Sequence, residues 1–205
     1  MIKKIIPHLT LFFAFALSAL SSEQRIICLG DSLTAGYGVQ ESEAWPALLQ
    51  KQLNKEHTDS KVINAGTSGA TSAGGLRKLP WLFKKKVDVL IIALGANDGL
   101  RGLSTEVLEE NLQKIITSAK KKNPSIRIIL AGMKMPPNMG KEYTSKFEAL
   151  YPRLAKKNDI ELLPFMLEGV AGHPKMNLAD GIHPNSEGHK IISNLIWKVL
   201  IKKDL

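Results

Sequence analysis

Three residues that could together perform nucleophilic catalysis occur in two short polar segments of this sequence. Ser32 follows an apolar run in "ICLGDSLTAGYG" (27–38), whereas Asp180 and His183 lie close together in "DGIHPN" (180–185). A serine hydroxyl is a weak nucleophile until a nearby base takes its proton, and a histidine base needs an acceptor that orients its ring. We therefore predict that Ser32 is the nucleophile, His183 its base and Asp180 the acid that orients the imidazole.

Two further polar segments contain hydrogen-bond donors suited to the same reaction. They are "NAGTSGATS" (64–72), which contains Gly69, and "LGANDG" (94–99), which contains Asn97. Attack on an ester carbonyl creates a negatively charged oxygen, which fixed N–H donors stabilise. We predict an oxyanion hole made by the backbone N–H groups of Ser32 and Gly69 and by the side-chain amide of Asn97.

Each of these residues also has a purely structural interpretation. Ser32 and Asn97 are residue types that cap helices, and His183 could be a surface turn residue before a proline. Asp31 could be a second orienting acid or an acceptor for loop N–H groups. The catalytic interpretation is favoured because all of these residues are expected at one edge of one sheet.

Short apolar runs alternate with amphipathic segments along the chain. The runs expected to be strands are residues 25–30, 61–66, 87–95, 126–132 and 160–164. The segments expected to be helices are residues 43–56, 72–86, 104–122, 142–158 and 186–203. This alternation predicts an α/β fold, a three-layer α/β/α sandwich with a flavodoxin-like, five-stranded parallel sheet in the order 2-1-3-4-5. The polar segments then meet at the carboxyl edge of the sheet, and residues 164–182 can reach back to Ser32.

The polar motifs, taken together, resemble the motif blocks of the SGNH (GDSL) hydrolase superfamily. "GDSL" (30–33), "SGATS" (68–72), "GAND" (95–98) and "DGIHPN" (180–185) occur in the family's order and spacing. The stretches "AWPALL", "NDGLRG" and "YPRLAKK" are similar to the branch of periplasmic acyl-CoA thioesterases, lysophospholipases and arylesterases. The resemblance implies a triad of Ser32, Asp180 and His183, with Ser32, Gly69 and Asn97 as oxyanion donors.

The sequence departs from that branch at two positions, which bear on substrate preference rather than on the catalytic groups. Ala70 stands where the branch often has an acid, and Ala96 stands where a second glycine is common. We expect a serine esterase that hydrolyses medium-to-long acyl esters and thioesters, lysophospholipid among them, through an acyl-enzyme. No metal or cofactor is expected, because the histidines and acids lack zinc-ligand spacing and no phosphate-binding loop motif occurs.

The acyl-chain expectation rests on the loops around the strand ends, residues 69–82, 133–143 and 164–179. Their apolar side chains suit hydrocarbon and include Leu76, Met133, Met135, Met139, Met166 and Leu167. Glycines 69, 74 and 75 are expected to keep this edge open. One alternative is a carbohydrate O-deacetylase on the same scaffold, for which aromatic platforms would be expected. Another is a flavodoxin-like binding module, which would not need Asp180 and His183 in register.

The N-terminal segment has the pattern of a secretory signal peptide. Lys3 and Lys4 precede an apolar run from Leu9 to Leu20, which is shorter than the roughly 20 residues that span a bilayer. We predict a signal peptide over residues 1–21, a single domain over residues 22–205, and a periplasmic or secreted protein. An uncleaved membrane anchor is the alternative.

The formal net charge of +9 comes from lysines that cluster near the ends of predicted helices, where cations complement the helix dipole. Aromatic residues are not interleaved with these clusters, so no nucleic-acid partner is expected. The expected partners are small-molecule acyl esters or thioesters, with at most transient contact with a membrane surface. Cys28, the one cysteine, lies in an apolar run and is expected to be buried and inert. His57 and His189 are expected to be structural or solvated, and His173 is a candidate for lining the site.

Overall fold

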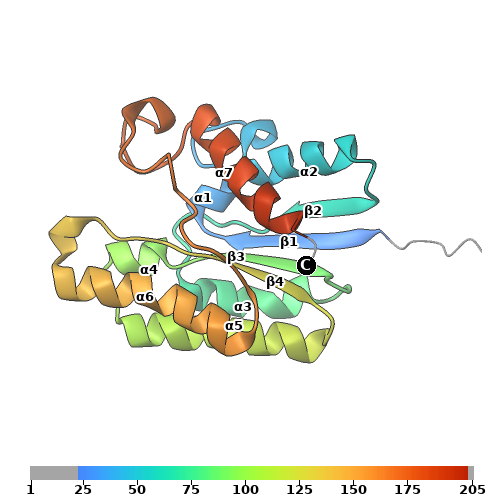
Figure 1. Ribbon diagram of the computed structural model, residues 1–205, viewed down its shortest axis with the longest axis horizontal. Helices are drawn as coiled ribbons and strands as arrows, with labels where there is room; N and C mark the ends of the chain where they lie inside the picture. The colour runs from blue at the N-terminus through green and yellow to red at the C-terminus, as the bar shows by residue number, and fades with distance from the viewer. Residues whose placement is uncertain (1–22, 203–205) are drawn as a thin grey trace, which may run out of the picture.

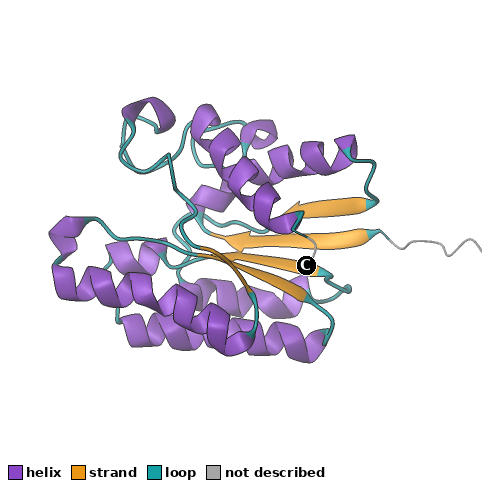
Figure 2. Cartoon of the chain, viewed as in Figure 1, coloured by secondary structure: helices purple, strands orange, loops and turns teal. Residues whose placement is uncertain are grey.

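Five parallel strands form the central layer of the computed structural model, which describes residues 23–202 (Figures 1 and 2). The strands are β1 (Gln24–Gly30), β2 (Ser60–Asn64), β3 (Val89–Ala93), β4 (Arg127–Ala131) and β5 (Glu161–Leu163). Their order is β2-β1-β3-β4-β5, and every neighbouring pair is parallel. The predicted fold class and strand order are therefore confirmed.

Helices cover both faces of the sheet, as predicted (Figure 1). One face is covered by α2 (Trp45–Lys55) and α7 (Ser186–Leu200). The other face is covered by α3 (Ser72–Leu82), α5 (Thr105–Lys122) and α6 (Lys141–Asn158). The remaining short elements are α1 (Ser32–Ala35), α4 (Ala96–Leu100) and the 3-10 turns η1 (Glu41–Glu43), η2 (Pro137–Met139) and η3 (Pro174–Met176).

The sequence of β3 reflects its central position. All of its residues, "VLIIA", are buried, because the strand pairs with β1 and β4 and has helices over both faces. In the neighbouring β1, Cys28 pairs with Ile91 on one side and Asn64 on the other. Cys28 is completely buried, as expected, and burial raises the pKa of its thiol.

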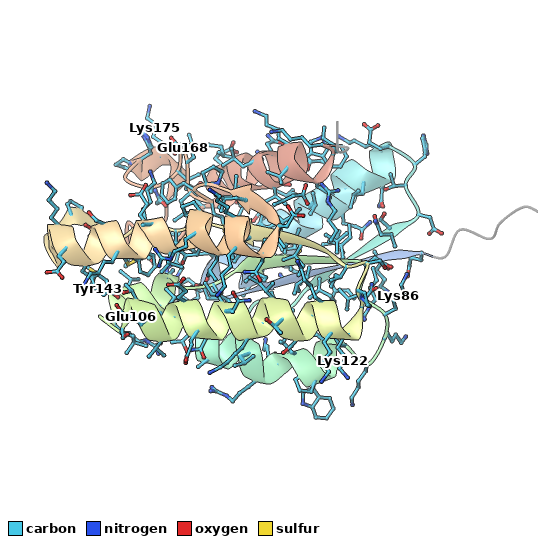
Figure 3. The ribbon with its side chains drawn as sticks, turned by 60° about the horizontal axis from the view of Figure 1, so that its bottom comes forward. Lys86, Glu106, Lys122, Tyr143, Glu168 and Lys175 are labelled. Carbon is cyan, nitrogen blue, oxygen red and sulfur yellow. The ribbon has the colours of Figure 1, made fainter. Side chains whose placement is uncertain are left out.

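The helix ends follow the capping chemistry of the sequence. Ser104 caps α5, since its hydroxyl accepts a hydrogen bond from the N–H of Val107 at 3.2 Å. The lysines of residues 120–122 lie in the last turn of the same helix. Figure 3 shows Lys86 and Lys122 at one end of the molecule and Glu106 and Tyr143 at the other. Lys86 precedes β3, and Lys122 ends α5, which starts near the carboxyl ends of the strands. Both lysines therefore lie at the opposite end of the sheet from the candidate site.

Gly74 and Gly75 lie in the helix predicted over residues 72–86, so they do not keep the sheet edge open as expected. Both lie in the first turn of α3, where the N–H of Gly75 donates to the carbonyl of Thr71 at 3.0 Å. Gly75 is buried against Leu94, and an added Cβ would lie 2.2 Å from Leu94 Cδ1. This glycine allows close packing of α3 on the sheet, and only Gly69 of the three belongs to the loop.

Candidate active site

Ser32, His183 and Asp180 form one continuous chain of hydrogen bonds. Ser32 Oγ lies 3.0 Å from His183 Nε2, and His183 Nδ1 lies 2.7 Å from Asp180 Oδ2. Ser32 comes from the carboxyl end of β1, whereas the other two come from the segment between β5 and α7. The fold therefore brings together Ser32 and His183, which are 151 positions apart in the chain.

The turn that contains Asp180 and His183 is held by its own hydrogen bonds. Asp180 Oδ1 accepts from the N–H groups of Ile182 and His183, each at 2.9 Å. Hydrogen bonds to the ionised carboxylate lower the pKa of Asp180 to about 2. The largest contribution comes from the backbone N–H of His183 and the next largest from its ring. The carbonyl of His183 accepts from the N–H of Leu178 at 2.8 Å, so the base is fixed from both sides of the turn.

An aromatic ring that the sequence interpretation did not identify contacts the imidazole. The rings of Tyr37 and His183 have their centroids 4.5 Å apart and are tilted by 41°. Tyr37 follows α1, and its N–H donates to the carbonyl of Ser32 at 3.1 Å. The contact joins two distant segments, so no local sequence pattern could have indicated it.

Ser32 reaches its position through a tight turn from strand to helix. The N-cap of α1 is Asp31, whose carboxylate accepts from the N–H of Leu33 at 3.0 Å. Gly30 is required before it, because an added Cβ would lie 2.0 Å from Thr34 Oγ1. Ser32 is thus the first residue of the helix rather than its cap, and its backbone N–H has no intrahelical acceptor. Its hydroxyl remains free to face His183.

Asn97 lies on α4, directly beyond the carboxyl end of β3. Gly95, at φ 118°, caps this helix, so Asn97 is not its cap. The Nδ2 of Asn97 donates to Asp31 Oδ2 at 3.3 Å, which places its amide beside the residue that precedes Ser32. Asp31 is fully buried, and this burial raises the pKa of its carboxyl group to about 6. Asp31 therefore holds Leu33 and Asn97, and it accepts no hydrogen bond from His183.

Gly69 lies in the loop between β2 and α3, on the other side of Ser32. Since β1 lies between β2 and β3, the residues that follow these strands flank the serine. Gly69 is exposed and has φ of 75°, a conformation that glycine adopts without strain. Its N–H has no acceptor among residues 23–202, whereas its carbonyl accepts from Arg101 Nη2 at 3.0 Å.

The other histidines among residues 23–202 lie outside this hydrogen-bonded chain. His189 is buried in α7, where its Nδ1 accepts from the N–H of Trp45 at 3.3 Å, so its structural role is confirmed. His57 is exposed at the end of α2. His173 is exposed and makes no side-chain hydrogen bond to the triad. Within the described part of the chain, no cluster of three or more His, Cys, Asp or Glu side chains could hold a metal ion.

Two of the methionines expected to bind an acyl chain are not accessible in the structure. Met133 and Met166 are buried in the core and are not available to a substrate. Instead, large apolar side chains are about half exposed in the segments that contain the site residues. They are Tyr37, Leu100, Leu103 and Ile182.

Comparison with known proteins agrees with this geometry. Residues 28–191 match the GDSL-like lipase/acylhydrolase family. An arylesterase from Vibrio mimicus is 38% identical over 97% of this chain and 99% of its own length. Thioesterase 1/protease 1/lysophospholipase L1 of Escherichia coli strain K12 is 38% identical over 94% of this chain and 91% of its own. A crystal structure of TesA superposes with a TM-score of 0.83 at 40% identity, covering 87% of this chain and 98% of that one.

Proposed function

The chain belongs to the GDSL-like lipase/acylhydrolase family and is a serine ester hydrolase, and on this basis we propose that it cleaves esters and thioesters through an acyl-enzyme on Ser32. The observation that supports this most directly is the unbroken chain from Asp180 through His183 to the serine hydroxyl. A hydroxyl in this arrangement can lose its proton as it attacks an acyl carbon.

The reaction begins with the proton of the serine. Ionised Asp180 accepts a hydrogen bond from Nδ1–H of His183, which leaves the lone pair of Nε2 facing Ser32 Oγ. As Oγ bonds to the acyl carbon, Nε2 takes its proton and then gives it to the departing alkoxide or thiolate. Water, deprotonated by the same nitrogen, then attacks the acyl-enzyme and releases the carboxylic acid.

The oxyanion of each tetrahedral intermediate is stabilised by donors from three neighbouring strand ends. The backbone N–H groups of Ser32 and Gly69 supply two donors, and the amide of Asn97 supplies the third. The amide is oriented because its other N–H is bound to Asp31. Removing one such donor typically costs about 10²–10³ in kcat.

The proposed substrates have medium-to-long acyl chains, lysophospholipid among them. Two observations support this. The E. coli and V. mimicus relatives are named as a thioesterase and lysophospholipase and as an arylesterase. Apolar side chains are also about half exposed near the site residues in the sequence, Tyr37 and Ile182 close to His183 and Leu100 and Leu103 after Asn97. Each methylene that such a surface buries contributes about 0.8 kcal/mol, so a few contacts produce a clear dependence on chain length.

The test is kcat/KM for p-nitrophenyl esters from acetyl to palmitoyl, repeated with an acyl thioester, a lysophospholipid and an acetylated sugar. We expect values that rise from acetyl to octanoyl or beyond, and hydrolysis of the thioester. A profile that peaks at acetyl and falls with length, with turnover of the acetylated sugar, would instead favour a carbohydrate deacetylase.

We also propose that the mature protein acts outside the cytoplasm. The predicted signal peptide, residues 1–21, lies outside the described residues, so the proposal rests on the sequence pattern. Among residues 23–202, no helix is long and apolar enough to cross a membrane. Mass spectrometry of the N-terminus after cell fractionation tests this proposal, and an intact Met1 on the active protein would favour an anchor.

A further inference from the structure

Arg101 connects the two segments that would supply the oxyanion donors. It follows α4 directly, and its backbone N–H donates to the carbonyl of Asn97 at 3.2 Å. Its side chain extends to the neighbouring loop, where Nη2 donates to the carbonyl of Gly69 at 3.0 Å. One residue is therefore bonded to both proposed donor residues.

Gly69 has few other constraints. On one side of Gly69, Thr67 is tied to the end of β1, since its N–H donates to the carbonyl of Gly30 at 3.1 Å; on the other, the N–H of Ala70 donates to the carbonyl of Thr67 at 3.0 Å. Glycine has no Cβ to restrict rotation, so an exposed glycine samples many backbone conformations. The N–H and the carbonyl of Gly69 project from the two peptide planes that meet at its Cα. A donor that fixes the carbonyl therefore also limits the directions in which the N–H can point.

A buried link fixes the base of the same two segments. Asp98 accepts from the N–H of Ser72 at 2.8 Å and from its hydroxyl at 2.6 Å. Asn111 Nδ2 donates to the same hydroxyl at 3.0 Å, and all three side chains are buried. This inner link holds the start of α3 against α4. The loop that contains Gly69 lies beyond it. Lys78 Nζ donates to the carbonyl of Ala65 and to Thr67 Oγ1, so it holds the first part of this loop, whereas Arg101 is the side chain among the described residues that bonds to Gly69 itself.

Arg101 is not committed to an ion pair. It is exposed, and it makes no salt bridge with any of residues 23–202. We infer that Arg101 is a positioning residue, which holds the N–H of Gly69 in the direction of the oxyanion. This inference rests on the proposed function, because it assumes that Gly69 is an oxyanion donor.

The test uses Arg101→Met, which keeps the aliphatic length but removes the donor. With a neutral p-nitrophenyl ester as substrate, we expect kcat per active site to fall about 10-fold, less than the loss of a whole donor, with KM changed less than threefold. Active sites are counted by titration with a fluorophosphonate, so that unfolded protein does not contribute. The pH at half-maximal activity should not move, since the triad is untouched. Arg101→Lys, which keeps a shorter donor, should recover part of the loss.

Arg77→Ala is the matched control. Arg77 is also exposed, lies on α3 near the same loop, and makes no hydrogen bond with any described residue. We expect its kcat to stay within twofold of the wild-type value. A loss of kcat as large as that of Arg101→Met would show a general effect of surface charge and would overturn the inference.

A double variant distinguishes an effect through Gly69 from one through Asn97. If Arg101 acts through Gly69, the fold losses of Asn97→Ala and Arg101→Met multiply, because the two donors are independent. If Arg101→Met has no effect in the Asn97→Ala background, or none on kcat in the wild type, the inference is wrong. Ser32→Ala is assayed in parallel: retained activity in that variant would overturn the proposed function itself, whichever result Arg101→Met gives.

Discussion

At the scale of single residues, the site depends on which atoms face each other. Asp180 uses one oxygen for the backbone N–H groups of its own turn and the other for His183 Nδ1. Ser32 Oγ has the remaining ring nitrogen as its hydrogen-bond partner. Because the two oxygens of Asp180 have separate partners, substitutions at this residue can separate the folding of the turn from its chemistry.

Ser32→Ala should leave a folded protein that lacks the proposed nucleophile. Among residues 23–202, the hydroxyl has His183 as its hydrogen-bond partner, so we expect little change in melting temperature but a fall in kcat/KM of at least about 10⁴-fold. A fluorophosphonate probe should label the wild type at Ser32 and leave the variant unlabelled, as peptide mass spectrometry can determine. Labelling at another serine would contradict the assignment.

Asp180→Asn should retain the turn and lose the chemistry. The Asn side-chain oxygen can still accept from the N–H groups of Ile182 and His183, but its NH2 group would face Nδ1 and favour the wrong tautomer of the ring. We expect kcat to fall by about 10³–10⁴ with an unchanged circular dichroism spectrum. A variant within threefold of wild type would show that another acid orients the base.

Because the pKa of Asp180 is about 2, Asp180→Asn removes a negative charge that the wild type carries at every assay pH. The carboxylate stays ionised throughout the range in which an esterase is assayed, so its titration does not limit the wild-type activity.

At the scale of elements, close packing of helices on the sheet sets the geometry of the strand ends. α3 approaches β3 at Gly75, where the glycine meets the fully buried Leu94. α1 begins immediately after β1 because Gly30 lets Thr34 pack against it. These contacts position the segments that contain Ser32, Gly69 and Asn97 relative to each other.

Gly75→Ala should therefore destabilise the protein, whereas Gly74→Ala should not. An alanine Cβ at 75 would lie 2.2 Å from Leu94 Cδ1, and such overpacking costs about 1–3 kcal/mol of unfolding free energy. At 74 the nearest atom is Ala70 Cβ at 3.6 Å, so alanine fits and is neutral or stabilises the helix by up to about 1 kcal/mol. Urea unfolding of both variants measures this difference, and equal midpoints would contradict it.

At the scale of the whole molecule, two buried titratable groups act on stability in opposite directions. Burial lowers the pKa of His189 to about 4. The stability that the neutral ring contributes to the folded state is therefore complete above the pKa of histidine in the unfolded chain, and it is lost as the pH falls toward 4. Burial raises the pKa of Asp31 to about 6. The stability that the protonated carboxyl group contributes to the folded state is therefore complete below the pKa of aspartate in the unfolded chain, and it is lost as the pH rises through 6. Both groups titrate between about pH 4 and 6.5.

His189→Asn should reduce the loss of stability in acid. The Asn oxygen can replace Nδ1 as acceptor for the N–H of Trp45 but takes up no proton. The wild type should lose up to about 3 kcal/mol relative to this variant between pH 7 and pH 4, measured by urea unfolding at each pH. Asp31→Asn should show the opposite sign over the same range, and parallel pH curves for wild type and His189→Asn would contradict the prediction.

The sequence by itself determined the fold class, the strand order and the set of candidate site residues. The reason is that apolar periodicity and glycine-rich strand ends are local properties, and parallel topology places every strand end at one edge. The ordered motif "GDSL" lies at the carboxyl end of β1, "GAND" follows the carboxyl end of β3, and "DGIHPN" lies in the segment before α7, as their spacing predicted.

The tertiary structure alone decided which side chains are buried and which distant groups meet. Met133 and Met166 lie in loops that pass through the core, so their apolar character did not reveal whether a substrate could reach them. The sequence predicted a helix at Gly75 but not its packing against Leu94, because a glycine that permits close packing looks in sequence like one that permits motion. The contacts of Tyr37 with His183, of Asn97 with Asp31 and of Arg101 with Gly69 join different strand ends. No local pattern encodes such contacts, because they depend on the packing of the folded chain.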